Sequence, residues 1–407
     1  MLVLAIACLV SAAAWVYLLV AHGGYWTTRQ RLPTGPTVDR WSAGDVAAGQ
    51  WPGVVAVVPA RNEADMLPTT LPPLLGQDYP GEFRVVLVDD GSQDGTGQIA
   101  AELAAKAALD GGAPLTVVAG RPRPDGWVGK VWAMAQGATA SAEAGPPRYL
   151  LFTDADIEWG PGALRELVAA AEGDDQAVVS QMALLRAQTA WERQIVPAFV
   201  YFFAQLYPFR RASDPRSRTA AGAGGCMLVR RSALDSAGGL EQIRGALIDD
   251  VAFATLLKRA GNRCWLGLST RVRSVRPYPR LADLWHMIAR SAYTQLRYSP
   301  MLLAGTVVGL LLLYAAPPAG AIVWLAVAAA GGRSGTATVL AGVAGLAGWA
   351  LMTVSYLPML RFYRLSPLRA PTLPLIALLY AAMTADSARR HYSGQSVSWR
   401  GRAAERV

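Results

Sequence analysis

Long uncharged segments at both ends of the chain dominate its hydrophobic pattern. Leu2 to Val20 carries no charge over about 19 residues, which is long enough to cross a bilayer as a helix. No Lys or Arg precedes it, and the bulky Trp15, Tyr17 and Tyr25 stand where a cleaved secretory signal would need small residues. We therefore predict that this segment is a retained membrane anchor.

The C-terminal third of the chain is membrane-like again. Three uncharged runs follow one another there: Met301 to Ala330, Val339 to Leu360 and the shorter Pro371 to Thr384. The first of them is interrupted by Pro317-Pro318. We expect a multi-pass membrane protein.

Arginines beside these runs predict orientation, because cytoplasmic loops carry an excess of Lys and Arg. Arg29, Arg31 and Arg40 place the start of the first segment outside and residues 27–300 in the cytoplasm. The basic tail also favours the cytoplasm; it contains Arg389, Arg390, Arg400, Arg402 and Arg406. Both basic segments cannot be cytoplasmic if the last run crosses fully. Either that run is re-entrant, or the Pro317-Pro318 break hides two short crossings.

Residues 50–300 alternate continuous apolar runs with helix-like segments. The apolar runs are Val54–Val58, Arg84–Val88, Leu115–Val118 and Tyr149–Phe152, and the helical segments are Glu63–Leu75, Thr96–Leu109 and Lys130–Ala144. Continuous rather than alternating apolar strands, joined by crossover helices, predict an α/β fold with a mostly parallel sheet and helices on both faces. Ligands of such sheets bind beyond the carboxyl ends of the strands.

The composition is that of a basic and apolar protein. The chain has 407 residues, is 53% hydrophobic and 16% charged, and carries a net charge of +9. Such a charge can indicate nucleic-acid binding, but arginines on a cytoplasmic face beside anionic lipid explain it better, so we predict no nucleic-acid partner. The three Cys and three His are far apart in the sequence, which disfavours a zinc site.

The motif Asp154-Ala155-Asp156 follows the apolar run that ends at Phe152. In a strand, side chains at i and i+2 project on the same face, so both carboxylates can point at one site. Hard oxygen ligands of this kind suit Mg²⁺ or Mn²⁺, which typically also hold substrate phosphates. The motif alone is weak evidence, since any junction of strand and loop can carry it, but its neighbours strengthen it.

A second acidic turn, Asp89 to Thr96, follows the second apolar run. Its glycines permit unusual backbone angles, and we assign Asp94 to turn and cap formation. Asp89 and Asp90 end an apolar strand, where they could hydrogen-bond a base edge or a ribose hydroxyl. A dinucleotide-binding loop would need G-x-G-x-x-G after the first strand, and Gly129-Lys130 lacks the upstream glycine of a P-loop, so neither phosphate-binding motif is present.

Three separated motifs, in order over roughly residues 50–300, resemble those of family 2 glycosyltransferases: Val57 to Glu63, the Asp-Asp-Gly-Ser-x-Asp-Gly-Thr turn and Asp154-Ala155-Asp156. Members of this family are inverting enzymes with a GT-A (Rossmann-like) fold that use nucleotide-diphosphate sugars. The whole layout is similar to one bacterial subgroup, the hopene-associated glycosyltransferases. The resemblance implies a Mg²⁺ or Mn²⁺ cofactor.

The resemblance also implies a set of residues that bind the nucleotide sugar. They are Pro59, Arg61, Glu63, Asp89, Asp90, Lys130, Asp154 and Arg297. Asp89 and Asp90 would contact the nucleoside, whereas Asp154 and Asp156 would bind the metal and the donor diphosphate. Lys130 lies in a segment that looks like the family's Gly-Lys segment and would be near the donor; a solvated lysine at a helix start is the alternative.

The family places its catalytic carboxylate at the start of a later helix, usually as Glu-Asp. Asp249-Asp250 stands at that place here, so Asp250 aligns with the general base. Two acids that open a helix also meet its positive end, which stabilises each by about 0.3–1 kcal/mol and keeps a carboxylate ionised. A capping role and a catalytic role are compatible.

Many membrane members carry Gln-x-x-Arg-Trp on an interfacial helix. The nearest run here, Gln295-Leu296-Arg297-Tyr298, is one residue short and has Tyr for Trp, which disfavours a processive polymer synthase. Arg297 would either touch the diphosphate or snorkel beside the membrane. We expect Trp191–Arg211 and Leu281–Tyr298 to lie in the headgroup zone, with core helices of the catalytic domain as the alternative. The loop Ala221–Gly225 exposes bare backbone, where we expect the acceptor or the sugar to approach.

These observations predict six segments: an anchor (1–22), a linker (23–50), a GT-A catalytic domain (51–278), an interfacial helix (279–300), a transmembrane region (301–388) and a basic tail (389–407). The predicted enzyme sits in the bacterial inner membrane with its catalytic domain in the cytoplasm, and transfers a sugar to a lipid acceptor, with a hopanoid-related lipid as first candidate. Polyprenyl phosphate or an envelope polysaccharide is the alternative acceptor. A hydrolase with two carboxylates would need neither nucleotide pocket nor metal, and a scaffold without chemistry would lack acids at one of the three acidic sites.

Overall fold

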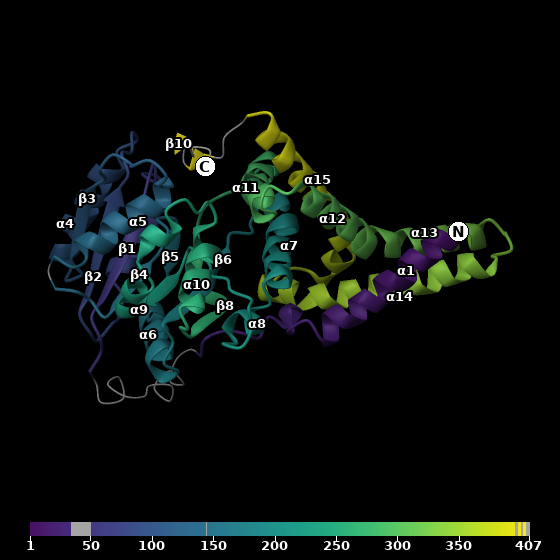
Figure 1. The fold of residues 1–407 in the computed structure, drawn as a ribbon, viewed down its shortest axis with the longest axis horizontal. Coiled ribbons are helices and arrows are strands. Elements are labelled where there is room, and N and C mark those ends of the chain that lie inside the picture. The colour runs from purple at the N-terminus through teal and green to yellow at the C-terminus, as the bar shows by residue number, and fades with distance from the viewer. Residues whose placement is uncertain (34–49, 144, 395–397, 400–401, 404–407) are drawn as a thin grey trace. The chain divides into compact units, whose positions relative to one another are not determined.

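The structure is a computed structural model that describes residues 1–33, 50–143, 145–394, 398–399 and 402–403. Most of the predicted linker and of the basic tail therefore lies outside the described residues. The chain divides into two compact units (Figure 1). The helical unit contains the described residues of Met1–Thr28, Ala187–Pro208 and Tyr278–Gln395, and the sheet unit contains those of Arg29–Arg186, Phe209–Pro277 and Ser396–Val407.

The sheet unit is built on an eight-stranded sheet in the order β3-β2-β1-β4-β7-β6-β8-β5. The strands are β1 (Val54–Ala60), β2 (Phe83–Asp89), β3 (Leu115–Ala119), β4 (Tyr149–Phe152), β5 (Ile157–Trp159), β6 (Val178–Leu185), β7 (Met227–Arg230) and β8 (Cys264–Ser274). Strands β1 to β4 pair parallel with one another, and β6 pairs parallel with β8. Strand β7 pairs antiparallel with both β4 and β6, and β5 pairs antiparallel with β8. Sequence analysis anticipated the first four strands and missed the other four.

Helices cover both faces of this sheet, which explains the continuous apolar strands. These helices are α3 (Leu67–Leu75), α4 (Thr96–Leu109), α5 (Gly129–Ala140), α6 (Ala163–Gly173), α8 (Phe209–Ser213), α9 (Arg231–Ser236) and α10 (Asp249–Arg259). Residues of α3, α4 and α6 share one buried core with Val54 and Ala56, while α5, α9 and α10 share the other with Val55 and Val57. On the second face, a Cβ on Gly137 would stand 2.4 Å from Val57, so α5 can lie close against β1 only because Gly137 has no side chain.

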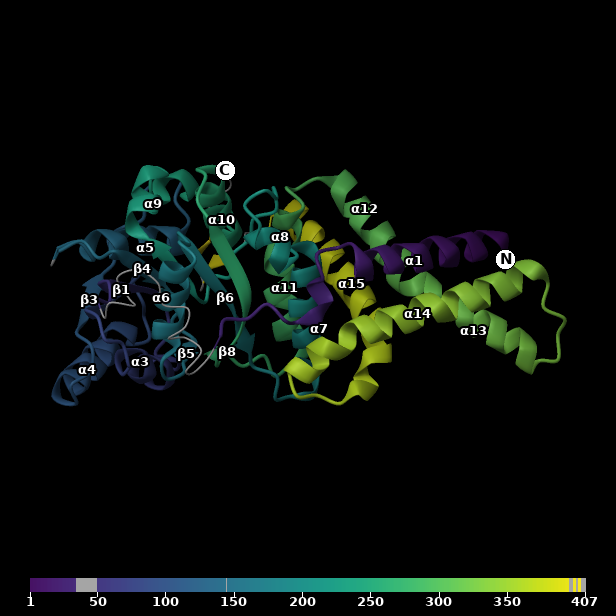
Figure 2. The same ribbon diagram turned by 90° about the horizontal axis from the view of Figure 1, so that it is seen from below.

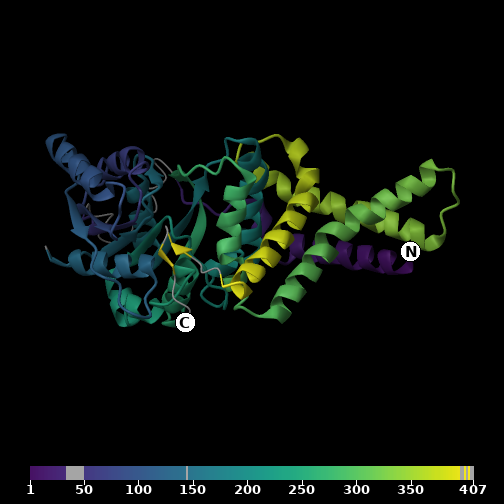
Figure 3. The ribbon, with the colours of Figure 1, turned by 90° about the horizontal axis from the view of Figure 1, so that it is seen from above.

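The helical unit contains α1 (Leu2–Val20), η1 (Tyr25–Thr27), α7 (Ala190–Leu206), α11 (Leu281–Gln295), α12 (Pro300–Leu310), η4 (Leu311–Ala315), α13 (Ala316–Ala329), α14 (Thr336–Phe362), η5 (Pro367–Thr372) and α15 (Leu373–Tyr392). Helices α1, α13 and α14 pack side by side (Figures 2 and 3). Four stretches of the described chain have the length and composition to cross a membrane: Leu2–Val20, Pro300–Ala329, Thr336–Phe362 and Pro367–Tyr392.

The proline pair does not break the second of these stretches. Pro317 and Pro318 have no N–H and leave the carbonyl of Leu313 without a donor in either α- or π-helical spacing. Helix α1 supplies the missing donors, because Ser11 Oγ and Trp15 Nε1 donate to Leu313 O at 3.1 and 2.9 Å. The chain therefore stays helical through η4, a π-turn, into α13. The alternative in which this pair hides two short crossings is wrong.

Helices α7 and α11 belong to the helical unit, so the alternative that they are core helices of the catalytic domain is wrong. The buried Tyr201 of α7 hydrogen-bonds Tyr25 (3.0 Å) and Ser355 of α14 (2.6 Å). Glu192, in the first turn of α7, is fully buried; it caps its own helix and accepts from the backbone N–H of Tyr278 at 2.7 Å. Glu192 therefore connects the two segments by which the chain returns to the helical unit, one before α7 and one before α11.

Candidate active site

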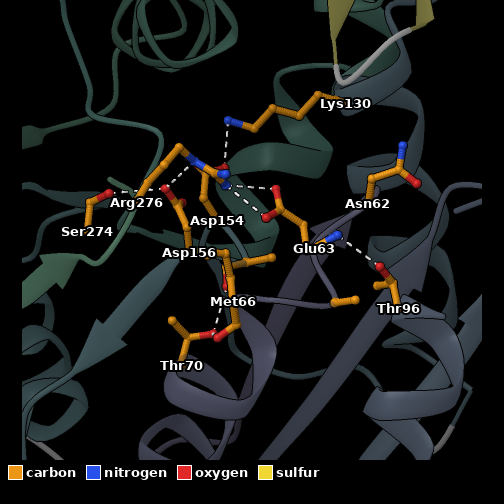
Figure 4. Close-up of polar contacts among 12 residues, drawn as sticks. Asn62, Glu63, Met66, Thr70, Thr96, Lys130, Asp154, Asp156, Ser274 and Arg276 are labelled. Atoms are coloured by element: carbon orange, nitrogen blue, oxygen red, sulfur yellow. Dashed lines mark hydrogen bonds and ion pairs between the residues drawn. The ribbon is translucent and has the colours of Figure 1, made fainter. Parts of the chain in front are cut away.

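The Asp154-Ala155-Asp156 motif lies just beyond the carboxyl end of β4, in a turn that leads to β5, and not within the strand as the prediction from strand faces assumed. The turn is closed by a hydrogen bond from Ile157 N to Asp154 O at 3.2 Å. The two carboxylates therefore do not share a strand face, and each pairs with a different cation (Figure 4). Lys130 Nζ lies 2.8 Å from Asp154 Oδ1, and Arg276 Nε donates to Asp156 Oδ2 at 2.9 Å.

Arg276 is a site residue that sequence analysis missed. It follows β8, and its Nη2 also donates to both carboxylate oxygens of Glu63, at 2.8 and 2.9 Å. Ser274 Oγ donates to the same oxygen of Asp156 as Arg276 does, at 3.0 Å. Burial raises the pKa of Glu63 to about 7, although Arg276 opposes that change. Arg276 thus connects the turn after β1 with the turn after β4. No local motif marks it.

Lys130 joins Asp154 to the acids at the start of α10. Its Nζ lies 2.8 Å from Asp154 Oδ1 and 3.0 Å from Asp249 Oδ2. Burial opposes its charged form, but Asp154 and Asp249 hold the pKa of the Lys130 ammonium above its usual range. A Cβ on Gly224 would stand 3.0 Å from this nitrogen, so the glycine loop 221–225 leaves room for it. The alternative of a solvated lysine is wrong, because its side chain is only 16% exposed.

Asp250 contacts the same glycine loop from the first turn of α10. Its Oδ2 accepts from Gly224 N at 3.1 Å and its Oδ1 from Val251 N at 2.8 Å, so the carboxylate has a structural role there. Burial and the neighbouring Asp249 raise its pKa to about 6, against the effect of Lys130. A carboxyl group with such a pKa is ionised at neutral pH and can still accept a proton effectively.

The acids after β2 have more structural partners than the sequence suggested. Asp89 Oδ1 accepts from Ser92 N at 2.9 Å, and a Cβ on Gly97 would stand 2.6 Å from Asp89 Oδ2. Asp90 is buried and forms an ion pair with Arg61. The turn-forming role predicted for Asp94 is confirmed, because its carboxylate accepts from the N–H groups of Ala64 and Thr96.

Pro59 lies inside central strand β1, which is unusual because proline cannot donate to a ladder. Pairing of β1 with β4 ends at Val57 and Phe152, whereas pairing with β2 continues to Ala60. Val57 O accepts from Thr153 N on the β4 side, so Pro59, two residues on, faces that same side beyond the last rung. Its missing N–H therefore costs no ladder bond, and β1 delivers Arg61 and Glu63 to the site.

Two further features do not share the elements that build this cluster. Arg297 belongs to the helical unit, in the turn after α11, with φ of 51°. A cavity of ≈ 410 Å³ lies at the opposite, amino ends of β1, β2 and β4, and its lining includes Val54, Arg84 and Arg148. Because ligands of parallel sheets bind at the carboxyl ends, this cavity is not the candidate active site.

The donor set is suited to a divalent cation bound together with a diphosphate. Within the described ranges, no group of three or more His, Cys, Asp or Glu side chains could hold a metal alone. Mg²⁺ typically takes one or two carboxylates and completes its shell with phosphate oxygens and water. Asp154 and Asp156 offer such a pair, since the contacts above occupy one oxygen of each carboxylate.

Comparison with known proteins finds a family model that matches the part of the chain carrying most of this site. The model described as Glycosyl transferase family 2 matches residues 55–238. The match is to the family 2 glycosyltransferase model and is confined to this part of the chain. The acidic turns after β2 and β4 and Lys130 fall inside it, whereas Asp250 and Arg276 lie beyond it. The match agrees with the resemblance to family 2 glycosyltransferases that the sequence motifs suggested.

The solved structures that resemble the chain include a mannosyltransferase from Pyrobaculum calidifontis, in complex with GDP-Man and Mn²⁺. It is 19% identical, with a TM-score of 0.54 over 95% of this chain and 99% of that one. This likeness confirms the predicted GT-A fold. Mannosyl-3-phosphoglycerate synthase from Rubrobacter xylanophilus is 18% identical over 68% of this chain and 84% of that one, with a TM-score of 0.41. No curated protein sequence matches the chain.

Proposed function

We propose that the protein is a membrane-bound inverting glycosyltransferase that moves a sugar from a nucleotide-diphosphate sugar to a lipid acceptor. The observation that carries this proposal is the position of Lys130, 2.8 Å from Asp154 and 3.0 Å from Asp249. Lys130 thereby links Asp154, which we expect to bind the donor diphosphate, to the start of α10, where we expect Asp250 to accept a proton.

Each side chain has a defined task in the reaction. Asp250 takes the proton from the acceptor hydroxyl, whose oxygen forms the new bond to the anomeric carbon. The bond between that carbon and the diphosphate breaks on the opposite face, and its electron pair leaves with the nucleoside diphosphate. Lys130 lies where it can offset the negative charge that builds on the leaving group.

Asp154 and Asp156 would hold a Mg²⁺ or Mn²⁺ ion against the diphosphate. The ion would supply electrostatic stabilisation of the leaving group. Asp89, Asp90, Arg61 and the backbone after Pro59 stand at the neighbouring strand ends, where they would contact the nucleoside.

The acceptor is proposed to be a membrane lipid because of the candidate membrane-crossing helices of the helical unit. The exposed residues of α1, α12 and α14 are largely aliphatic, as a lipid-facing surface requires; they include Leu2, Val3, Val20, Met301, Val308, Val343 and Val354. A bacterial inner membrane with the sheet unit in the cytoplasm agrees with the arginines that follow α1. A hopanoid-related lipid remains the first candidate acceptor.

The test uses the purified full chain in detergent with a bacterial lipid extract and a panel of nucleotide-diphosphate sugars. Nucleoside-diphosphate release is measured with Mn²⁺, with Mg²⁺ and with EDTA, and the lipid products are identified by mass spectrometry. We expect one donor to give metal-dependent release and a glycosylated lipid. If the product is a polyprenyl-linked sugar, the acceptor is polyprenyl phosphate and not a hopanoid-related lipid. Release from no donor, or release that EDTA leaves unchanged, would contradict the proposed chemistry.

A further inference from the structure

We propose that α15 does not cross the membrane but returns to the side from which it enters, so that the chain crosses three times and its basic tail lies on the side of the sheet unit. This inference rests on the membrane-bound function proposed above. It concerns the helical unit alone and follows from the partners of the two ends of α15.

One end of the helical bundle, here called the near end, is the end at which the sheet unit is connected. Along the chain, segments of the sheet unit are inserted between η1 and α7 and again between α7 and α11. Tyr201 of α7 binds Tyr25, which follows α1, and Ser355, near the end of α14. The C-terminal ends of α1 and α14 therefore both belong to the near end. The N-terminus and the loop between α13 and α14 form the far end (Figures 1 and 3).

The C-terminal end of α15 lies at the near end. His391 stacks on Tyr298 with ring centroids 4.5 Å apart, and the hydroxyls of Tyr392 and Tyr293 are 2.9 Å apart. Tyr293 and Tyr298 come immediately before Pro300, where α12 begins. Because α12 starts the crossing from the side of the sheet unit, the last turn of α15 is on that side too.

The start of α15 lies no farther from the near end than the middle of α14. Arg369 Nη1 donates to Gln194 Oε1 of α7 at 2.8 Å, and Gln194 Nε2 donates to Thr372 Oγ1 at 2.6 Å. Trp349 Nε1 donates to Pro371 O at 3.0 Å, about 20 Å before the end of α14. The chain therefore turns back along part of α14 through η5 and then returns to the near end as α15, which is a re-entrant path.

The views of the molecule agree with this path. Helices α1, α13 and α14 extend together well beyond α15 toward the N-terminus in all three ribbon views (Figures 1, 2 and 3). A helix that crossed with them would accompany them to the far end.

Charge placement supports the same topology. Arg361, Arg364 and Arg369 surround the connection between α14 and α15, and Arg389 and Arg390 end α15. Three crossings put both groups on the same side of the membrane as Arg29 and Arg31, as the positive-inside rule favours. Asp386 accepts from Trp285 of α11 and pairs with Arg389 and Arg390, so α15 is polar where it meets α11. Of the four candidate segments, α15 is also the least apolar.

Three crossings give the near end a distinct surface made of α7, α11 and α15. Its exposed large apolar side chains include Trp191, Leu206, Leu375, Leu378 and Tyr392. Apolar and aromatic side chains with flanking arginines suit helices that lie among lipid headgroups. The partner of this surface is the headgroup layer on the side of the sheet unit, from which an acceptor lipid would be drawn.

Cysteine labelling tests the topology. Three single substitutions give reporters: Ser236→Cys in the sheet unit, Ser334→Cys in the loop between α13 and α14, and Ser393→Cys after α15. Cys8, Cys226 and Cys264 are buried, so the parent protein gives the background. Right-side-out and inverted vesicles from cells that express each variant are treated with a membrane-impermeant maleimide.

We expect the reporters at 236 and 393 to be labelled in the same vesicles and the reporter at 334 in the opposite ones. Labelling of 393 together with 334 would show that α15 crosses, which overturns the inference and leaves the proposed function intact. Labelling of 334 together with 236 would show that the hairpin of α13 and α14 does not cross. That result overturns the inference and also the membrane-spanning part of the proposed function, while donor hydrolysis remains separately measurable.

Discussion

Lys130 and Arg276 are the two cations that organise the acidic site at the scale of single residues. Each binds one carboxylate of the Asp154-Ala155-Asp156 turn and one acid from elsewhere: Asp249 for Lys130 and Glu63 for Arg276. Charged groups in partly buried sites interact strongly because water screens them little. Removal of either cation should therefore change the properties of both of its acidic partners.

Replacing Lys130 by Gln should shift the pH dependence of transfer. Asp250 must be ionised to accept a proton, so activity should fall as pH drops through about 6, its raised pKa. Lys130 lowers that pKa, and its loss should move the acid limb of kcat/KM upward by on the order of one pH unit, besides lowering the rate. Lys106→Gln, on the exposed surface of α4, is the matched control. An acid limb that stays in place would show that Lys130 does not act on the base.

Replacing Arg276 by Gln should weaken metal binding without unfolding the protein. Arg276 and Ser274 occupy one oxygen of Asp156 and so orient the other, and loss of such an orienting partner typically costs about 10–100-fold in metal affinity. The dissociation constant of Mn²⁺ in the presence of inorganic pyrophosphate measures this without any sugar donor. Arg273→Gln, exposed on the same strand, should bind Mn²⁺ like the parent. Unchanged Mn²⁺ affinity in Arg276→Gln, with an unchanged Tm, would remove Arg276 from this role.

The elements of the sheet unit show why sequence reasoning found one half of the sheet and missed the other. Val54–Val58 and Tyr149–Phe152 are buried on both faces and read as continuous apolar runs. Strand β8 alternates buried and exposed residues toward its end, with Arg271 and Arg273 in it, and a continuous-run criterion passes over it. Arg276 follows that strand, so its approach to Glu63, 213 positions earlier, had no local signal.

The acidic turn was misplaced for a related reason. Asp154 and Asp156 follow an apolar strand, and continuation of that strand would have put both carboxylates on one face. Strand β4 ends at Phe152, however, and β5 begins at Ile157 with a different partner, β8. Two strands that pair with different neighbours need a turn between them, and pairing partners at this distance are not visible in the sequence.

Helix α1 should stabilise the helix formed by η4 and α13 through the two hydrogen bonds to Leu313 O. Ser11→Ala alone leaves the bond from Trp15 to Leu313 O and should cost little stability. Combined with Trp15→Phe it leaves a buried carbonyl without a donor, which costs roughly 1–3 kcal/mol. The two substitutions should therefore destabilise the protein by more than the sum of their separate effects, measured by unfolding in detergent micelles. Tyr17→Phe, exposed on the same helix, is the control; strict additivity would argue against the shared acceptor.

In the whole molecule, two units with different exposed surfaces share one chain. The sheet unit buries a core on both faces of an eight-stranded sheet and carries the acidic site, while the helical unit exposes aliphatic side chains. The proposed transfer from a polar donor to an apolar acceptor would use both environments. The sequence predicted this division from its apolar ends and its α/β middle, but the path of α15 required coordinates, because composition alone allows it to cross.

Whether Asp250 takes the proton in sugar transfer is tested by comparing the parent protein with Asp250→Asn, using the donor found in the panel. Donor binding is followed by calorimetry and transfer by the rate of glycolipid formation. Because the amide keeps the shape of the carboxylate but cannot accept the proton, we expect donor affinity within about threefold of the parent and a rate at least about 100-fold lower. A variant that transfers at the parent rate would contradict the account, since the acids at α10 would then lie beside the reaction without taking part in it.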